Sequence, residues 1–267
     1  MRAERQDAYK VFSEAVKTIT ESGRPGSRAM AIYSLGRIAM EHVEYRQQAI
    51  DLLRLYVLAH TPKSGPLGAR AERIPTDVQA AISALGSVPK ALEPGEGQLS
   101  LDRAYLVGAS FTGQRSGFRG VLFTQASLLA VDFSGVDLSN ADFRGSEFHD
   151  WVAFGWTGEN PWTDEIATTR RWQDWEKFRF AAKFMGATLV RTDFRNTGLN
   201  GALFNRADLA YAQFGGANLS RADFRGARNI HLAKFVDSET GAPACADDPA
   251  HFDESVIVRL AKCSGAS

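Results

Sequence analysis

A five-residue spacing of large apolar residues constrains most of this chain after residue 100. A small residue, most often Ala, stands two positions before most of them. A period of five fits neither the 3.6 of a helix nor the 2 of a strand. Self-similarity at a short fixed period predicts a solenoid, whose units bury their apolar faces only by stacking. The spaced residues are Leu101, Leu106, Phe111, Phe118, Phe123, Leu128, Phe133, Leu138, Phe143 and Phe148, and then Phe184, Leu189, Phe194, Leu199, Phe204, Leu209, Phe214, Leu219 and Phe224.

Glycines mark the expected corners of the solenoid. They stand two positions after an apolar centre, where a tight turn can demand a positive φ. Four such sides would close a coil of about twenty residues, and successive coils would stack about 4.8 Å apart. Leu and Phe would then form inward columns while the polar positions face water. The glycines are Gly108, Gly113, Gly120, Gly135, Gly145, Gly186, Gly201, Gly216 and Gly226.

Segments such as Ala217-Asn218-Leu219-Ser220-Arg221 and Ala222-Asp223-Phe224-Arg225-Gly226 resemble the pentapeptide-repeat family. The resemblance covers roughly residues 99–148 and 182–235. It implies that family's fold, a right-handed quadrilateral β-helix. The departures from the pattern are Val121, Val131, Val136 and Ser146 at the small position and a two-residue slip at Gln114-Arg115. We expect a local widening or bulge there.

Residues 1–92 lack the five-residue period and instead place apolar residues at helical spacing. Four short amphipathic helices are expected, enough for a small bundle or a HEAT-like pair of hairpins. The run from Ala29 to Ala39 resembles the helical region that precedes the repeats in many bacterial pentapeptide proteins. We expect this bundle to cap the open coil end, with partner binding compatible beside that role. Some relatives carry membrane helices upstream, but the longest apolar run here, Leu55 to Ala59, is far below the roughly 20 residues a span needs.

The predicted fold is therefore an α+β multi-domain chain. Its parts are an all-α N-terminal domain over residues 1–92, a linker over 93–98, a first part of the β-helix over 99–148, a Trp-rich helical insert over 149–181, a second part of the β-helix over 182–235 and a C-terminal cap or tail over 236–267.

The insert holds all five tryptophans of the chain. Two interpretations stand side by side: a helix that folds back and buries its rings against the solenoid, or an exposed patch that anchors a protein partner. The second follows from the enrichment of Trp and Arg among residues that dominate binding energy. The candidate partner-binding residues are Trp151, Trp156, Trp162, Arg170, Arg171, Trp172 and Trp175.

Composition and motifs argue against an enzyme. The chain has 31 basic and 31 acidic residues, so no global charge favours nucleic acid or an anionic membrane. The five histidines show no paired metal-ligand spacing, and neither a serine nucleophile motif nor a phosphate loop with lysine occurs. We therefore expect no catalytic residue, cofactor, metal or small-molecule substrate, and no direct binding of nucleic acid.

The C-terminal tail carries the two cysteines, Cys245 and Cys263. Without an export signal they are expected to be reduced thiols in a cytosol, the alternative being a disulfide that would staple the tail after the repeats. A short helix from Asp253 to Lys262 is expected to shield the far end of the solenoid. If that shielding is incomplete, two chains could form a homodimer by stacking end to end.

The leading functional hypothesis is a non-enzymatic scaffold that binds another protein in a bacterial cytoplasm. The resemblance implies an alternative, a DNA mimic that protects gyrase or a related topoisomerase, which needs a continuous anionic surface. Another alternative is a peripheral component of a membrane complex. Residues 184–235 argue against mimicry, because they set Arg191, Arg195, Arg206, Arg221, Arg225, Arg228 and Lys234 against Asp193, Asp208 and Asp223.

Overall fold

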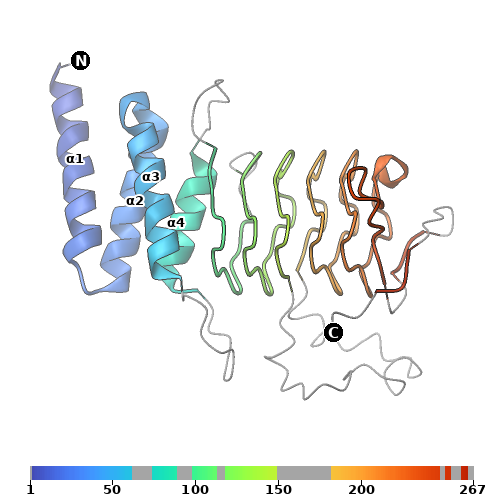
Figure 1. Cartoon of the computed structure of the whole chain (residues 1–267). Helices are drawn as coiled ribbons and strands as arrows, with labels where there is room; N and C mark the ends of the chain where they lie inside the picture. Colours follow the sequence, from blue (N-terminus) through green and yellow to red (C-terminus); the bar gives the residue numbers. More distant parts are fainter. Residues whose placement is uncertain are drawn as a thin grey trace.

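The computed structural model describes residues 2–61, 74–88, 98–112, 118–148, 182–246, 250–253 and 260–263. A group of helices forms one end of the molecule, and stacked coils follow it in sequence order (Figure 1). The predicted insert over residues 149–181 lies outside the described residues, as does the slip at Gln114-Arg115. None of the helices in the described part of the chain has the length and apolarity that crossing a membrane takes.

Four helices form the N-terminal domain: α1 (Arg2–Glu21), α2 (Pro25–Glu41), α3 (Val43–His60) and α4 (Thr76–Ser87). The predicted number of helices is confirmed. Pro25 begins α2, where its missing N–H leaves no helical hydrogen bond unmade. Helix α2 contacts each of the other three helices, and α3 also contacts α4. The core of the bundle therefore lies around α2, with Ile32, Leu35 and Ala39 fully buried.

A hydrogen-bonded polar cluster ties α2, α3 and α4 together inside this bundle. The Tyr56 hydroxyl donates to Oδ2 of Asp77 over 2.7 Å, and Nε of Arg28 donates to the same oxygen over 2.8 Å. Asp77 is 1% exposed. Burial alone raises the pKa of the Asp77 carboxyl, but the hydrogen bonds from Tyr56 and Arg28 outweigh burial and hold this pKa below its ordinary value. The carboxylate is therefore kept charged within the bundle.

After the helices, parallel bridges join each coil to the next. Leu122 pairs with Asp142, Asp193 with Gln213 and Leu203 with Asp223, each twenty residues apart. One bridged residue precedes each apolar centre, and a two-residue turn follows it. No strand longer than one bridged residue occurs in the described segments. The coil thus returns above itself after four five-residue sides.

Two ladders of phenylalanine rings run along opposite sides of the coil interior. Stacked neighbours lie 4.4 to 5.4 Å apart between ring centroids, and rings of different ladders meet edge to face, as Phe204 and Phe214 do at 89°. Both arrangements are favourable for aromatic pairs. Leucines occupy most of the remaining two columns. One ladder is Phe123, Phe143, Phe194, Phe214 and Phe235, and the other is Phe111, Phe133, Phe184, Phe204, Phe224 and Phe252.

In the coils up to Arg228, two pairing offsets differ from twenty residues and mark where the repeat is interrupted. The pairing offset is 22 residues from Tyr105 to Ser127 and 51 residues from Asp132 to Lys183, instead of the regular twenty. A phenylalanine enters a leucine column next to each interruption, at Phe118 and at Phe148, and both rings are buried. The larger rings fill the interior at the two places where the chain leaves the regular coil.

The expected widening at Val121, Val131, Val136 and Ser146 is not found. The three valines are at most 1% exposed, and their carbonyls accept inter-coil hydrogen bonds of 2.9 to 3.0 Å. Ser146 is 1% exposed, and Glu147 beside it keeps its inter-coil hydrogen bond to Ala126 at 3.0 Å. The Ser146 hydroxyl donates to the Phe123 carbonyl of the preceding coil. Thr192 and Thr197 occupy equivalent inward positions and donate to carbonyls of the preceding coil over 2.9 and 3.0 Å. Hydroxyls therefore fit the narrow interior when the backbone accepts their hydrogen bonds.

The N-terminal end of the stack is covered by α4. The side-chain amide of Gln79 donates to the carbonyl of Ser110 over 2.6 Å, and its oxygen accepts from the Ser110 N–H over 2.9 Å. Ile74 N–H donates to the carbonyl of Val107 nearby. One glutamine thus makes the two hydrogen bonds that a further coil would make, which satisfies backbone groups of the first coil that would otherwise form an open edge.

The C-terminal end corrects the expectation of reduced thiols. Cys245 and Cys263 form a disulfide, with 4.9 Å between their Cα atoms. The stack brings them together, because Ala261 pairs in parallel with Cys245. The expected helix from Asp253 to Lys262 is wrong at its end, since residues 260–263 are not helical; residues 254–259 lie outside the described residues.

Candidate interaction surfaces

The predicted partner-binding residues lie outside the described residues. They are Trp151, Trp156, Trp162, Arg170, Arg171, Trp172 and Trp175. Their role in binding stays a prediction. Within the described residues, no group of three or more His, Cys, Asp or Glu side chains is arranged to hold a metal ion.

Helix α2 has an apolar outer face in addition to its buried one. Met30 is 69% exposed, Tyr33 51% and Met40 42%. Because residues three and ten positions apart lie on the same side of a helix, these side chains share one face. Arg37 is also exposed between them. This face lies opposite the buried stripe of Ile32, Leu35 and Ile38, so α2 is apolar on two sides. We call the exposed set, Met30, Tyr33, Arg37 and Met40, the outer face of α2.

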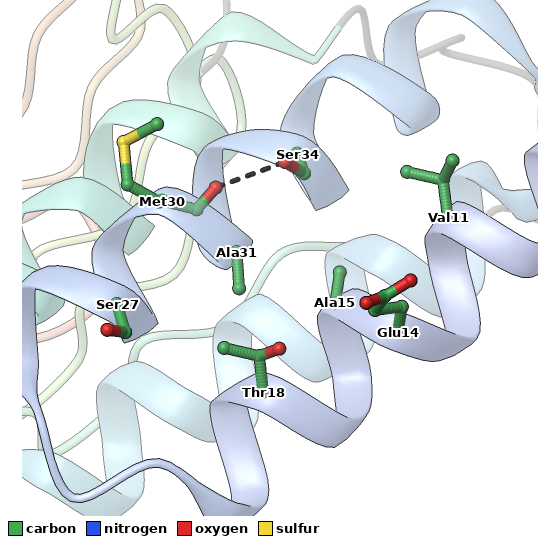
Figure 2. A pocket seen from close by; sticks show the side chains of 8 residues that line it. All are labelled: Val11, Glu14, Ala15, Thr18, Ser27, Met30, Ala31 and Ser34. Atoms are coloured by element: carbon green, nitrogen blue, oxygen red, sulfur yellow. Dashed lines mark hydrogen bonds between the residues drawn. The ribbon is translucent and has the colours of Figure 1, made fainter.

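A shallow groove between α1 and α2 borders this face, with a volume of about 450 Å³. Figure 2 shows its lining side chains on the two neighbouring helices, with Ala15 and Ala31 between them. The buried side chains of Ala15 and Ala31 keep the two helices close, while Val11 and Met30 lie more exposed. The polar lining consists of Glu14, Thr18, Ser27 and Ser34. Met30 thus belongs both to the groove and to the outer face of α2.

Exposed apolar side chains concentrate on the helical domain. Ten large apolar side chains are substantially exposed among the described residues, and seven of them lie on α1, α2 and α3. A gathering of exposed apolar side chains marks interaction sites more often than isolated ones do. The seven are Tyr9, Val11, Met30, Tyr33, Met40, Val43 and Leu55.

On the coils, one face carries charges that alternate in sign. Arg144 forms a 2.6 Å ion pair with Asp142 of its own side and lies 3.7 Å from Asp193 of the next coil. Arg195 repeats the arrangement with Asp193 at 2.8 Å. The hydrogen bond to Asp142 is the main cause that raises the pKa of Arg144 above its ordinary value.

The alternating row continues to the C-terminal hairpin. Arg195 also lies 3.5 Å from the buried Asp237 and 3.4 Å from Glu239. Hydrogen bonds from the N–H groups of Glu239 and Thr240 are the first cause that lowers the pKa of Asp237. Since every carboxylate of this row has an arginine beside it, the face is not the continuous anionic surface that DNA mimicry needs.

Some arginines of residues 182–235 also contact neighbouring side chains. Arg225 pairs with Asp223 at 2.6 Å, and the guanidinium of Arg191 lies 6.0 Å from the centroid of the exposed Tyr211 ring. Such contacts reduce the positive potential that the residue count suggested.

The outer face of α2 was missed when the chain was considered as a sequence. Its signal was present, because Met30, Tyr33 and Met40 follow helical spacing out of phase with Ile32, Leu35 and Ile38. One buried apolar stripe is enough to pack α2 in the bundle, so packing does not explain the second apolar stripe. The sequence does not show which side of α2 the helices α1, α3 and α4 cover, and the exposure of the second stripe depends on their positions.

Comparison with known proteins identifies the repeats. The sequence model of the family described as pentapeptide repeats matches residues 118–150 and 187–226, in eight copies. No curated protein matches the chain.

Several solved structures resemble the coils. Full-length QnrB1, described as a plasmid-mediated fluoroquinolone resistance protein, is 23% identical, with 55% of this chain and 55% of that chain covered and a TM-score of 0.36. AT2G44920 from the thylakoid lumen of Arabidopsis thaliana is 19% identical over 54% of this chain and 80% of its own, with a TM-score of 0.28. HetL, described as involved in heterocyst differentiation regulation in Nostoc sp. strain PCC 7120, is 16% identical over 54% and 68%, with a TM-score of 0.19. The chain spans about half the length of QnrB1, and similarities this low carry no inference about function.

Proposed function

Because this chain is a pentapeptide-repeat protein, we propose that it is a non-enzymatic scaffold that binds a protein partner through its helical domain. The stacked coils, which we take to be a right-handed quadrilateral β-helix, would hold that domain on a stiff support. The Trp-rich insert would be a second binding element. The cytoplasmic location predicted from the sequence stays a prediction.

The observation that carries this proposal is the outer face of α2. Met30, Tyr33 and Met40 are exposed although the helix already has a buried apolar stripe. Burial of apolar surface contributes about 25 cal/mol per Å², so a partner that covers these side chains gains affinity. Tyr, Met and Arg are enriched in the cores of protein interfaces, and Arg37 completes that composition. Methionine adapts its shape to the partner surface.

The coils supply the rigidity that a scaffold needs. Every ring from Phe111 to Phe224 in the two ladders is at most 1% exposed, and backbone hydrogen bonds join each coil to its neighbours. Close-packed interiors transmit force with little deformation. The direct hydrogen bonds between Gln79 and Ser110 couple α4 to the first coil. A partner bound on α2 would therefore be held in a defined position relative to the coil faces.

The test is an affinity pull-down from a lysate of the native host with the intact chain and three variants. The first carries Met30→Ser and Tyr33→Ser on α2. The second replaces residues 151–180 with a Gly/Ser linker. The third, Met185→Ser, changes an exposed methionine on a coil, 40% exposed, as a control for loss of an apolar surface side chain elsewhere.

Loss of a specific partner from the α2 variant alone supports the proposal, and loss from the linker variant assigns the contact to the insert. A partner that all variants retain equally would overturn both assignments. If the intact chain retains no specific partner, the scaffold hypothesis itself is wrong. Recovery of topoisomerase subunits would favour the protection hypothesis instead.

A further inference from the structure

The last layer of the coil stack is attached by a disulfide. Cys245 belongs to the stack, whereas Cys263 belongs to residues 260–263, which lie over it. We propose that this bond is a redox-controlled latch on the C-terminal cap. In the oxidised protein it holds residues 260–263 against the final coil, and after reduction these residues leave.

The stack holds Cys245 firmly. Its N–H donates to the carbonyl of Ala217 over 2.9 Å, and its carbonyl accepts from Leu219 N–H over 2.8 Å. It therefore continues the parallel inter-coil pairing, from Asn218 to Cys245, although the offset there is 27 residues instead of twenty. Ala244 beside it is fully buried. This side of the disulfide has the same support as the inner coils and is expected to keep its place when the bond is broken.

Residues 260–263 contact the final coil from its outer side. Ala246 N–H donates to the carbonyl of Ala261 over 2.8 Å, and Ala261 N–H donates to the carbonyl of Ala244 over 3.1 Å. Leu260 is only partly buried against the core. Among the described residues, Ala261 is bridged on one side only, whereas Cys245 is bridged on both sides. A segment bridged on one side opens locally at lower free-energy cost than an inner layer does. The disulfide, which closes a separation of 18 residues, makes up for this by keeping the segment near its site.

The bond is accessible to a reductant, since both cysteines are only half-buried. A dithiol supplies the two electrons. One of its thiolates attacks a sulfur of the protein disulfide, forming a mixed disulfide and releasing the other protein cysteine as a thiolate, which takes up a proton. The second thiol of the reductant then displaces the remaining protein cysteine. The protein ends with two thiols and the reductant with one disulfide.

Opening would change the end of the stack. Without residues 260–263, the N–H of Ala246 and the carbonyl of Ala244 lose the partners that they have in the closed form. Unpaired backbone groups at the end of a β-structure form an edge that can pair with another chain. The reduced protein therefore presents a binding edge that the oxidised protein covers.

Hydrogen exchange of individual amides, with and without dithiothreitol, tests the latch on the full chain. We expect exchange at Ala246 and Ala261 to become about 100-fold faster after reduction. Gln213 N–H, which donates within the inner stack to Thr192, should not change. A Cys245→Ser/Cys263→Ser variant should exchange as the reduced protein does, whether or not dithiothreitol is present.

Unchanged exchange at Ala246 and Ala261 after complete reduction, verified by counting free thiols, would overturn the proposal. So would an equal acceleration at Gln213, because the disulfide would then be holding the whole stack and not a cap. Failure of dithiothreitol to reduce the bond in the folded protein would also contradict a latch.

Discussion

At the residue scale, the most informative group is the hydroxyl of Tyr56. Burial, followed by the hydrogen bond to the Asp77 carboxylate, raises the pKa of Tyr56 to about 12 from an ordinary value of 10.0. The charged phenolate would lie against a carboxylate in the bundle interior. Because the folded-state pKa is raised, the neutral hydroxyl contributes stability that is fully present below about pH 10 and is lost as pH rises through 12.

The first prediction concerns this hydroxyl. Tyr56→Phe should lower the free energy of unfolding by about 1–2 kcal/mol at neutral pH, because the buried Asp77 carboxylate loses a donor. Between pH 10 and 12 the wild type should lose stability as Tyr56 ionises, and the variant should lack this loss. Denaturant unfolding followed by the helical circular-dichroism signal checks both. Tyr33→Phe, at an exposed position, is the control and should behave as the wild type.

The second prediction concerns the coil corners. Ala130 has φ of 55° and Gly135 has φ of 70°, in the left-handed region that costs side-chain-bearing residues about 1–2 kcal/mol. Ala130→Gly should stabilise the coil by about 0.5 kcal/mol, because relief of this strain exceeds the entropy that glycine adds to the unfolded chain. Gly135→Ala should destabilise it by about 1 kcal/mol, although an added Cβ would meet no atom within 4 Å.

Thermal unfolding of the two corner variants provides the measurement. Gly23→Ala is the matched control, because its Cβ also has free space and its φ is not in the left-handed region. If Gly135→Ala and Gly23→Ala changed stability equally, backbone strain at the corners would not be the cause.

At the element scale, two helices of the bundle touch through a glycine. A Cβ on Gly36 of α2 would lie 2.9 Å from Cβ of Ala84 on α4, closer than such atoms pack. The glycine is therefore needed for the distance between α2 and α4. That distance in turn sets the position of α4, whose Gln79 covers the first coil.

The third prediction follows from this contact. Gly36→Ala should destabilise the helical domain by about 1–3 kcal/mol, the usual cost of overpacking. Gly26→Ala, in the first turn of the same helix and with open space around it, should be neutral or slightly stabilising. The measurement is the denaturant concentration at the midpoint of unfolding for Gly36→Ala and for Gly26→Ala. Equal midpoints would mean that α2 and α4 move apart without a loss of stability.

Much of the coil could be predicted because its pattern is local. An apolar residue every fifth position, with a glycine two residues later, places Leu106 and Gly108 correctly inside and at a corner. Corners without glycine were not predictable. Arg103, Tyr211 and Arg221 have positive φ because the stack imposes the turn on them, although their side chains favour other conformations.

Other features required the three-dimensional arrangement. Cys245 and Cys263 are 18 residues apart in sequence, and only the pairing of Ala261 with Cys245 brings them within bonding distance. Likewise, the exposure of Met30 depends on which sides of α2 its neighbours cover. Long-range packing, which leaves no periodic signal, decides both.

At the scale of the whole molecule, the two ends of the stack are protected in different ways. The N-terminal end uses the side chain of Gln79, which hydrogen bonds to both backbone groups of Ser110. The C-terminal end uses the Val236–Pro243 hairpin pairing and the cystine. In the described residues, hydrogen bonds and packing close the N-terminal end, whereas the C-terminal end adds a covalent bond to its hydrogen bonds.

Because the coil returns above itself after twenty residues, the length of the stack can change only in steps of one layer. Deleting residues 194–213 would join Asp193 to Phe214, so that Phe214 takes the place of Phe194, on which its ring already stacks. The result should be a folded protein one layer, about 4.8 Å, shorter. Deleting only residues 194–203 would place Phe204 in the column of Phe194 and rotate all later sides by half a turn. Small-angle scattering of the two deletion variants should show a shorter rod for the first and misfolding or altered faces for the second. Such a chain can change its reach in whole layers without changing either end.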